Sequence, residues 1–437
     1  MDFKVPQLGI CKIKSPLQLS KVQGDNIYDY IRDDERILYD TRLESYMQWI
    51  KDGTLPLSFE KAGPKEYLFF NPSKIKAAII TCGGLCPGLN NVIRSLTYTL
   101  HYRYHVPEII GFRYGYAGLN PEYNYPKVHL TPELVKNIHL MGGSFLGSSR
   151  GNQDTGIMVD TLVHEGINIL FCIGGDGTLK GVQALYEEIN KRKLHVSVCG
   201  IPKTIDNDIN FIEKSFGYET AFTIAHDIIR SAHNEATGAF NGIALIKLMG
   251  RDSGFIAAAA ALSIQEVNFV LIPEMTFDLH GEKGFLEVLK NRLLHRQHAL
   301  VVVSEGAGQF FFENMNMKHD ASGNVKYEDI GLFLKDNIQS YFKMLHFPIS
   351  MKYIDPSYII RSAPANANDS KFCNQLGQNA VHAAMAGKTG FVVGYWNNQF
   401  TLLPIPPTVQ QRKRIDLESG FWYNVLEATG QPVSLKN

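Results

Sequence analysis

The sequence predicts an α/β fold: two Rossmann-like three-layer domains with mainly parallel sheets, plus an N-terminal extension. Short, fully apolar segments alternate with amphipathic segments along most of the chain, which is typical of parallel strands covered by helices on both faces. These units outnumber what one sheet comfortably holds, and this predicts two domains. Glycine-rich and charged residues directly follow several apolar segments, and ligands of open parallel sheets bind at that end of the strands.

The first domain is predicted over residues 75–212, after an extension over 1–74 that is mixed in composition and rich in turn signals. We expect strands at 76–84, 108–115, 167–175 and 196–202, and helices at 88–104 and 179–193. The second domain is predicted over 213–405, with strands at 242–250, 269–275 and 299–306 and helices at 253–264 and 284–297. Residues 406–437 are predicted to form a C-terminal helical segment.

The composition excludes several classes of protein. The 437 residues are 45% hydrophobic and 20% charged, as in a globular domain, and 43 basic residues balance 43 acidic ones. This balance argues against a general nucleic-acid binder. Six cysteines are few for a disulfide framework in a chain of this length. With no signal-like N-terminus and no long apolar run, we expect no membrane partner and a cytoplasmic location.

Two glycine-rich stretches follow predicted strands of the first domain. TCGGLCPGLN (81–90) contains Gly83 and can bring backbone N–H groups close to a phosphate, although a tight strand–helix turn is an equally good interpretation. GGDGT (174–178) places Asp176 between glycines, where a Mg²⁺ ion could bridge it to phosphates. A turn with a solvated aspartate is the alternative, and the stretch is not a Walker A sequence.

The next predicted strand ends in PKTIDND (202–208). In an extended stretch Thr204, Asp206 and Asp208 would point to the same side. Two carboxylates held close together raise the pKa of one of them, which suits a general base. The alternative is a loop with a local turn at Asp206 and Asn207.

Other strand ends and loops carry arginines and a glutamate. Arg251 follows one strand, Glu305 follows another, and Arg150 lies in a Gly/Ser-rich loop. Tyr358 and Arg361 belong to a YIIR stretch that could hold a phosphate. Any one of these arginines alone is better explained by a salt bridge. Together with the glycine loops and carboxylates, they predict Mg²⁺-dependent phosphoryl transfer to a phosphorylated hydroxyl compound.

These motifs, in this order, resemble the 6-phosphofructokinase family. The resemblance is carried by TCGGLCPGLN, GGDGT, PKTIDND, MGR, the EG after a strand and YIIRS, and it spans roughly residues 75–405. DDERILYD (33–40) and KYIDPSYIIRSAPAN (352–366) resemble the longer branch found in protists, plants and some bacteria. The resemblance implies phosphoryl transfer from ATP, with Mg²⁺, to the 1-hydroxyl of fructose 6-phosphate. It also implies a homodimer or homotetramer.

The resemblance implies a role for each matched residue. Asp206 would be the base, assisted by Arg251 and Thr204, and Asp176 would hold Mg²⁺. The donor phosphates would be lined by Gly83, Arg150, Gly175, Asp176, Gly177, Thr178 and Lys203. The sugar phosphate would be held by Thr204, Ile205, Asp206, Asp208, Met249, Gly250, Arg251, Glu305, Tyr358, Ile359, Ile360 and Arg361. At two positions where the short bacterial form has phosphate-binding arginines, this chain has Gly242 and Ser370.

Two markers of the phosphoryl donor disagree. Pyrophosphate-dependent members have an aspartate at the position of Gly177, where its bulk and charge would exclude the α-phosphate of ATP, so Gly177 predicts ATP. Lys203 is shared with pyrophosphate users, but a flexible cation does not forbid ATP. We therefore expect ATP, with pyrophosphate as the alternative.

Two other classes of protein compete with this prediction. NAD and diacylglycerol kinases share GGDGT, but they would not be expected to combine it with PKTIDND and MGRDSG. A non-catalytic regulatory paralogue would be expected to lose Asp206 or Asp176, and both are present.

Overall fold

The computed structural model describes residues 3–312 and 327–437, and the chain divides into two compact units. We call them unit 1 and unit 2. Unit 1 comprises Met1–Thr204, Ile209–Gly217 and Ala363–Gln411. Unit 2 comprises Ile205–Asp208, Tyr218–Ser362 and Arg412–Asn437.

This division differs from the predicted one at the C-terminal side. Residues 363–405 belong to unit 1, because β14 (Phe391–Trp396) pairs in parallel with β9 (Ser197–Pro202). β15 (Gln399–Pro404) then extends the same sheet antiparallel to β14. Backbone hydrogen bonding thus returns the chain to the sheet from which it departed, a long-range pairing that local sequence patterns do not reveal.

Unit 1 is built on a sheet whose nine strands, within the described residues, lie in the order β2-β3-β15-β14-β9-β8-β5-β6-β7. The run from β14 to β6 is parallel, while the pairs outside it are antiparallel. The remaining strands are β2 (Arg36–Leu38), β3 (Ser58–Lys61), β5 (Lys76–Thr81), β6 (Glu108–Phe112), β7 (Lys127–His129) and β8 (Ile169–Gly174).

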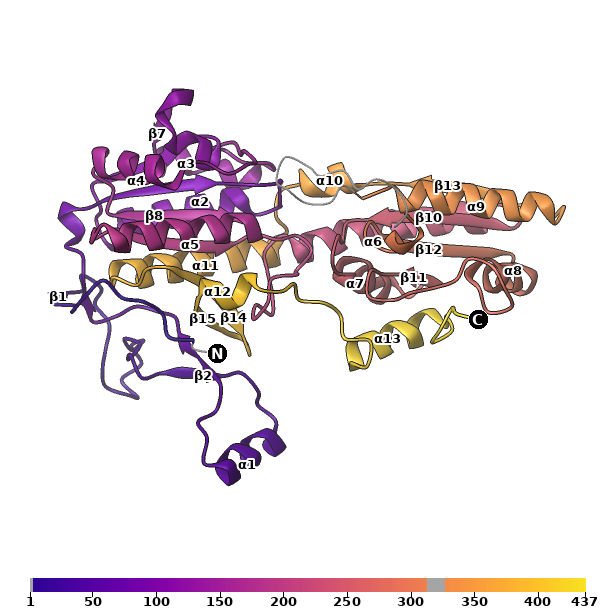
Figure 1. Ribbon diagram of the computed structural model, residues 1–437, viewed down its shortest axis with the longest axis horizontal. Helices are drawn as coiled ribbons and strands as arrows, with labels where there is room; N and C mark the ends of the chain where they lie inside the picture. The colour runs from indigo at the N-terminus through magenta and orange to yellow at the C-terminus, as the bar shows by residue number, and fades with distance from the viewer. Residues whose placement is uncertain (1–2, 313–326) are drawn as a thin grey trace. The chain divides into compact units, whose positions relative to one another are not determined.

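Helices cover both faces of this sheet (Figure 1). α4 (Thr155–His164) and α5 (Asp176–Lys191) pack on the side chains of one face, which include Ala78, Ile80 and Leu170. The alternate residues of the same strands are also buried, on the face where α2 and α11 pack together. The other helices of unit 1 are α1 (Leu43–Asp52), α2 (Leu89–Tyr98), α3 (Pro132–Val135), α11 (Ala367–Met385) and α12 (Ile405–Val409).

The N-terminal extension adds a small two-stranded pair and a projecting helix. β1 (Ile13–Lys14) pairs antiparallel with β4 (Tyr67–Leu68). α1 lies at the end of an excursion between β2 and β3, and none of its residues is buried (Figure 1). Short 3₁₀ and π turns complete unit 1 at Pro72–Lys74, Thr99–Arg103, Gly115–Leu119, Pro121–Tyr123 and Ile138–Leu140.

Unit 2 contains a fully parallel sheet in the order β11-β12-β10-β13. Its strands are β10 (Gly242–Leu248), β11 (Phe269–Leu271), β12 (His298–Ser304) and β13 (Ser350–Ile354). Its helices are α6 (Tyr218–Thr237), α7 (Phe255–Ile264), α8 (Phe285–Arg296), α9 (Ile330–Met344), α10 (Ser357–Arg361) and α13 (Gly420–Thr429), with a 3₁₀ turn at Gln309–Phe312. One continuous apolar cluster forms the core of the unit.

The predicted α/β class and the alternation of strands and helices are confirmed. The helix predicted from 179 begins earlier, at Asp176, so the stretch expected to be a loop supplies the first turn of α5. The helix predicted at 88–104 is α-helical only to Tyr98 and continues as a π turn to Arg103. Among the helices of the described residues, none has the length and apolarity to cross a membrane.

Candidate active site

In unit 1 the predicted phosphate loops converge at the carboxyl ends of β5, β8 and β9. The Lys203 N–H donates to the Gly174 carbonyl oxygen (2.9 Å), which joins the ends of β8 and β9. After β5, the Gly83 N–H donates to the Ser149 carbonyl oxygen (3.0 Å), and the Ser148 hydroxyl donates to the Gly83 carbonyl oxygen (2.6 Å). Gly83 has φ +80°, a backbone conformation that would be strained in a residue with a side chain.

The GGDGT stretch forms the N-terminus of α5. Gly175 is the extended N-cap residue, and Asp176 is the first helical residue. The N–H groups of a first helical turn have no partner within the helix, so this end of α5 is suited to bind an anion such as phosphate. A Cβ on Gly177 would meet no atom within 4 Å, so open space lies beside this turn. Thr178 is buried, and its carbonyl oxygen accepts a hydrogen bond from the Tyr116 hydroxyl (2.7 Å).

Two cations lie against the glycine loop after β5. A Cβ built on Gly83 would lie 3.6 Å from Nζ of Lys203, and one on Gly84 would lie 3.7 Å from Nη2 of Arg150. Lys203 is buried, with 7% of its surface exposed. Positive charge therefore lies beside the backbone at the position predicted for donor phosphates.

The carboxylate of Asp176 is the candidate ligand for Mg²⁺. It forms an ion pair with Lys180 one turn along α5, with an O–N distance of 2.9 Å. Across the described ranges, no group of three or more His, Cys, Asp or Glu side chains gathers as a metal site. A single carboxylate fits Mg²⁺, which typically binds one or two protein carboxylates together with phosphates and water.

In unit 2 the predicted extended geometry of Asp206 and Asp208 is wrong. Ile205 and Asp206 form a turn, and Asn207 adopts a left-handed conformation with φ +56°. An asparagine tolerates this conformation better than most residues, so the local turn, the alternative interpretation, is what forms. Thr204 lies in unit 1, where its carbonyl oxygen accepts from the Ser215 hydroxyl (2.6 Å).

Asp206 has the properties expected of a base. Its Oδ2 accepts from the Arg251 N–H (3.3 Å), while its enclosed Oδ1 has no hydrogen-bond partner among the described residues. Burial raises its pKa, and the negative charges of Asp208 and Glu305 raise it further. The carboxylate therefore gains a proton more readily than an ordinary aspartate.

The loop after β10 brings a second group of predicted residues to Asp206. Gly250 has φ +130°, and a Cβ there would lie 2.5 Å from the Ser253 carbonyl oxygen, so a side chain would clash. The Ser253 hydroxyl donates to the Asp206 carbonyl oxygen (3.1 Å). Met249 is buried in the core, and the Arg251 guanidinium lies over the Tyr327 ring at 4.5 Å.

Glu305 follows β12, where its N–H donates to the Leu248 carbonyl oxygen at the end of β10 (2.9 Å). Burial raises its pKa, and the nearby positive charges of Arg361, Arg251 and Lys247 oppose this. The structure thus gathers four predicted residues in one charged region of unit 2: Asp206, Arg251, Glu305 and Arg361.

The YIIR stretch is helix α10. Tyr358 and Ile359 are exposed, and the Arg361 guanidinium lies 5.1 Å from the centre of the Tyr358 ring. The side chain of Ile360 is fully buried in the core of unit 2, which excludes contacts between this side chain and a ligand. The side chain of Ile205 is partly buried against the same core.

Sequence reasoning missed the residue that supports α10. Lys247 is a charged residue within the otherwise apolar β10, a pattern that could have revealed it. Its Nζ pairs with Oδ2 of Asp329 (2.7 Å) and of Asp355 (2.9 Å). Oδ1 of Asp355 accepts from the N–H and hydroxyl groups of Ser357, the first residue of α10 (3.1 and 2.5 Å).

Sequence reasoning also missed the basic segment before α13. Nη1 of Arg412 pairs with Oδ2 of Asp208 (3.2 Å), and the Lys413 N–H donates to the Asp208 carbonyl oxygen (2.8 Å). Nε of Arg414 donates to the carbonyl oxygen of Asp252 (3.1 Å). The run of basic residues in QRKR was a visible signal, although nothing local showed that it returns to unit 2.

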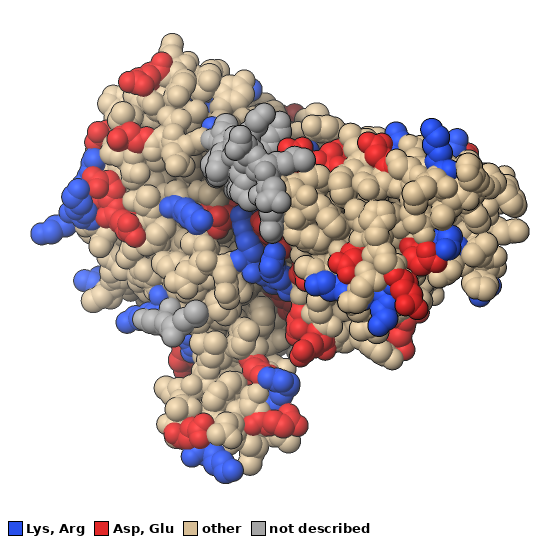
Figure 2. All heavy atoms as spheres, turned by 45° about the vertical axis from the view of Figure 1, so that its right-hand side comes forward, with Lys and Arg blue, Asp and Glu red and all other residues tan. Residues whose placement is uncertain are grey.

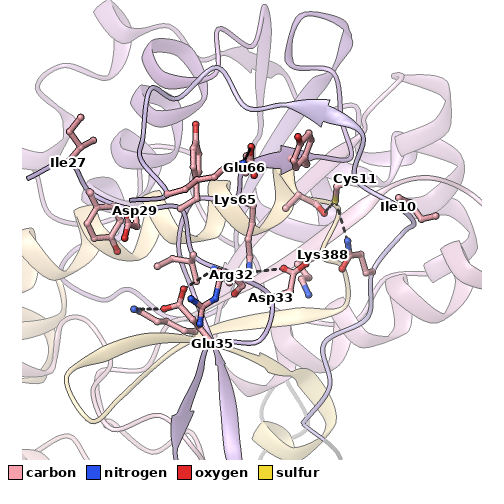
Figure 3. A pocket seen from close by; sticks show the side chains of 18 of the residues that line it. Ile10, Cys11, Ile27, Asp29, Arg32, Asp33, Glu35, Lys65, Glu66 and Lys388 are labelled. Atoms are coloured by element: carbon pink, nitrogen blue, oxygen red, sulfur yellow. Dashed lines mark hydrogen bonds and ion pairs between the residues drawn. The ribbon is translucent and has the colours of Figure 1, made fainter. Parts of the chain in front are cut away.

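A cavity of about 1350 Å³ lies in the N-terminal extension, and none of the predicted site residues lines it (Figure 3). Its walls carry both cations and carboxylates. Lys65 pairs with Asp33 (2.9 Å) and Lys61 pairs with Glu35 (3.0 Å). The lining residue Lys388 pairs with Glu60, which does not line the cavity. The charges are thus largely compensated within the protein, and the cavity is separate from the phosphate loops.

Comparison with known proteins agrees with these observations. Residues 76–384 match the phosphofructokinase family. The chain is 49% identical over 444 residues to "ATP-dependent 6-phosphofructokinase" of Borreliella burgdorferi, covering 100% of this chain and 98% of that protein. It is 43% identical to the protein of the same name in Amycolatopsis methanolica (99% and 95% covered) and 45% identical to that of Entamoeba histolytica (85% of each).

Solved structures agree on the fold. A pyrophosphate-dependent phosphofructokinase from Marinobacter aquaeolei matches with a TM-score of 0.67 at 20% identity, covering 81% of this chain and 91% of that one. Phosphofructokinase from Saccharomyces cerevisiae matches with a TM-score of 0.62 at 20% identity, covering 82% and 48%. The family match spans most of the chain and includes the glycine loops, the Asp206 turn and helix α10, so the chain belongs to the phosphofructokinase family.

Proposed function

We propose that the chain is an ATP-dependent 6-phosphofructokinase that transfers a phosphoryl group to the 1-hydroxyl of fructose 6-phosphate. The observation that carries this proposal is Asp206, whose enclosed Oδ1 has no hydrogen-bond partner among the described residues and whose pKa is raised. A hydroxyl proton would give Oδ1 its missing partner. The names of the relatives, at 43–49% identity, support the same activity.

The reaction follows from the groups present. Asp206 accepts the proton of the 1-hydroxyl while the hydroxyl oxygen of the sugar attacks the γ-phosphorus of ATP. A new bond forms between this oxygen and the γ-phosphorus, and the bond from the γ-phosphorus to the bridging β-phosphate oxygen breaks to release ADP. The N-terminus of α5, Lys203 and Arg150 would hold the donor phosphates, and Asp176 would hold Mg²⁺. When bound, Mg²⁺ neutralises charge on the transferring phosphates. Arg251 would stabilise charge near Asp206.

The sugar phosphate needs cations, and unit 2 offers Arg361 and Arg251. Gly242, which replaces an arginine of the short form, cannot carry any side chain here, because a Cβ would lie 2.0 Å from the Ala236 carbonyl oxygen. Ser370, which replaces the other, hydrogen-bonds through its hydroxyl oxygen with the Asn91 amide (2.9 Å). These two positions therefore have structural roles in this chain, and other residues must bind the phosphate group of the sugar.

The donor is tested by measuring turnover with ATP and with pyrophosphate on purified protein with Mg²⁺. We expect ATP, because the open space beside Gly177 leaves room for an α-phosphate. Pyrophosphate is the second candidate, favoured by the buried Lys203 beside Gly83. Turnover with pyrophosphate that equals or exceeds turnover with ATP would overturn the choice of donor.

Asp206→Asn tests the base. We expect loss of turnover with retained binding of fructose 6-phosphate, and a loss of about 10²–10⁴-fold is the usual contribution of such a base. Asp227→Asn, an exposed aspartate of α6 paired with Arg230, is the matched control and should leave turnover unchanged. Surviving activity in Asp206→Asn would refute the assigned mechanism. A wild-type protein that shows no turnover would instead revive the regulatory alternative.

We also propose a homodimer or homotetramer, supported by the exposed apolar stripe of α1. Leu43, Tyr46, Met47 and Ile50 lie at helical spacing and are 69%, 46%, 55% and 60% exposed. An amphipathic helix without a partner on its apolar face is typical of a protein–protein interface.

A second copy of α1 fits this stripe. In an antiparallel pair related by a two-fold axis, Leu43 would lie opposite Ile50 of the other copy. On the flank, Glu44 of each copy would then lie close to Lys51 of the other, so opposite charges would meet. Glu44 lies in the first turn of α1 and Lys51 in the last, and the surface around α1, at the bottom of Figure 2, carries both acidic and basic side chains.

Light scattering tests the assembly. Ile50→Lys should lower the measured mass, whereas Gln48→Lys, on the polar face of α1, should not. A monomeric wild-type protein would refute the assembly, and equal effects of the two variants would refute the role of the stripe. We further propose a cytoplasmic location, which suits a chain in whose described residues no disulfide bond joins the cysteines.

A further inference from the structure

The C-terminal segment of unit 2 brings a cation to the carboxylates around Asp206. Arg412, Lys413 and Arg414, which we call the basic strap, lie beyond residues 76–384, the part that matches the family. Although they are distant in sequence from residues 205–208, they belong to the same compact unit.

Arg412 bridges two loops. Its Nη1 lies 3.2 Å from Oδ2 of Asp208, and its Nε lies 3.9 Å from Oδ2 of Asp252. Asp208 follows Asp206 in the turn, and Asp252 follows Arg251 in the loop after β10. The side chain of Asp208 is 5% exposed, and that of Arg412 is 32% exposed, so this pair is shielded from solvent more than a surface ion pair.

The strap itself is fixed at several points. The Lys413 N–H donates to Asp208, the Lys413 ammonium lies 5.0 Å from the centre of the Phe255 ring, and the Ile415 N–H donates to Oε1 of Glu274 (2.8 Å). Both carboxylate oxygens of Glu274 also accept from the Gly254 N–H at the start of α7 (3.1 Å each). Because the backbone is held directly after Arg412, at Lys413 and again at Ile415, the strap presents Arg412 in a defined place.

Without Arg412, negative charge would accumulate around Asp206. Within the described residues, the charged side chains that interact with this aspartate or its neighbours include Asp208, Arg251, Asp252, Glu305, Arg361, Lys247, Asp355 and Arg412. Asp208, Glu305 and Asp252 all disfavour ionisation of Asp206, and Arg412 pairs with two of the three. A base must be ionised before it can accept a proton, so the charge of Arg412 bears on how much of the protein is active at a given pH.

We propose that Arg412 is a positioning residue of the phosphoryl-transfer site: it holds Asp208 and Asp252 in place around Asp206 and offsets their negative charge. The proposal rests on the proposed role of Asp206 as the base. It assigns a function to the C-terminal segment, and it places a cation near the reacting centre of a chain that has Gly242 and Ser370 where the short form has arginines.

The test is the pH profile of kcat/KM for fructose 6-phosphate with Mg²⁺ and ATP. Arg412→Gln should move the acid limb of the profile up by about one pH unit, the usual effect of losing an opposite charge close to a carboxyl group. Arg412→Lys keeps the charge and should leave the limb within about 0.3 units of wild type while raising KM, because it lacks the planar fork that can bridge two carboxylates.

Two further variants separate electrostatics from folding. Arg414→Gln removes an equal charge from the same strap, but its contact is with a backbone oxygen, and it should move the limb by less than half the shift of Arg412→Gln. Arg412→Gln combined with Asp252→Asn should return the limb towards its wild-type position, because a negative charge is removed with the positive one. Should Arg412→Gln fail to fold, the double variant and Arg412→Lys still carry the test.

The outcomes are distinguishable. An unmoved acid limb in Arg412→Gln, or an equal fall in kcat/KM at every pH, would overturn this proposal while leaving the base assignment intact. Equal shifts in Arg412→Gln and Arg414→Gln would also overturn it. Full turnover in Asp206→Asn would instead refute the base on which the proposal rests.

Discussion

Replacing Asp206 by asparagine should stabilise the folded protein while abolishing its activity. Burial and the negative charges of Asp208 and Glu305 raise the pKa of Asp206 from 3.8 to about 8. Between these two values the folded protein holds more protons than the unfolded chain, so the stability contributed by this site falls as the pH rises. Asparagine does not ionise and therefore avoids the cost.

The size of the effect follows from the shift in pKa. A difference from 3.8 to about 8, at about 1.4 kcal/mol per unit, sets an upper limit of about 6 kcal/mol at alkaline pH. Glu305, whose pKa burial also raises, can take up a proton in place of Asp206, which relieves part of this cost. We therefore expect Asp206→Asn to gain about 2 kcal/mol in free energy of unfolding at pH 8, and almost nothing at pH 4.

The assay is urea unfolding of wild type and variant between pH 4 and pH 8.5 at one protein concentration, which keeps any assembly constant. Asp227→Asn, in the exposed pair with Arg230, should change stability by less than about 0.5 kcal/mol at every pH. A variant no more stable than wild type at pH 8, or a gain that does not depend on pH, would show that the pKa of Asp206 is not raised in the folded protein. This result is separate from turnover, so it tests the electrostatics of the site directly.

Three further predictions concern the donor site, the metal and helix α10. Gly177→Asp should lower kcat/KM for ATP at least about tenfold by charge repulsion, whereas Gly177→Ala should retain activity because a Cβ meets open space; equal losses would contradict the exclusion argument. Asp176→Asn should raise the Mg²⁺ concentration for half-maximal turnover at least about tenfold, with exposed Asp160→Asn as the control; unchanged Mg²⁺ dependence would exclude Asp176 as a ligand. Lys247→Met should lower the free energy of unfolding in urea by about 2 kcal/mol, because it leaves Asp329 and Asp355 without their shared cation. It should also raise KM for fructose 6-phosphate by disturbing α10. The exposed control Lys352→Met should do neither, and an unchanged KM in Lys247→Met would show that Lys247 does not support the site.

The order of strands and helices was predictable because it depends on local composition. The apolar run of β8 and the glycines that follow it predicted both a buried strand and the position of Asp176 at its end. The placement of Asp176 inside α5 was not predicted, because the residues of GGDGT favour a loop when considered one at a time. The N-terminus of the helix forms there because Leu179 and Val182 are buried against the sheet.

The turn at Asp206 shows a second limit. Alternation along a strand predicted that Asp206 and Asp208 would share a face, and the left-handed Asn207 removes that regularity. The two carboxylates still influence each other, and the cause is the folded loop together with its contacts to Arg251 and Ser253. The raised pKa expected for one of these aspartates was therefore reached through an incorrect local geometry.

The amino-acid order was enough to predict the alternating α/β pattern, the glycine loops and the chemical types of the residues at the strand ends, because these properties depend on neighbouring residues. Tertiary structure alone decided which distant residues meet. It returned residues 363–411 to unit 1 through the pairing of β14 with β9, and it brought Arg412 to Asp208 and Asp252. The physical reason is that backbone pairing and ion pairs between remote segments depend on how the whole core packs, and no local pattern records that packing.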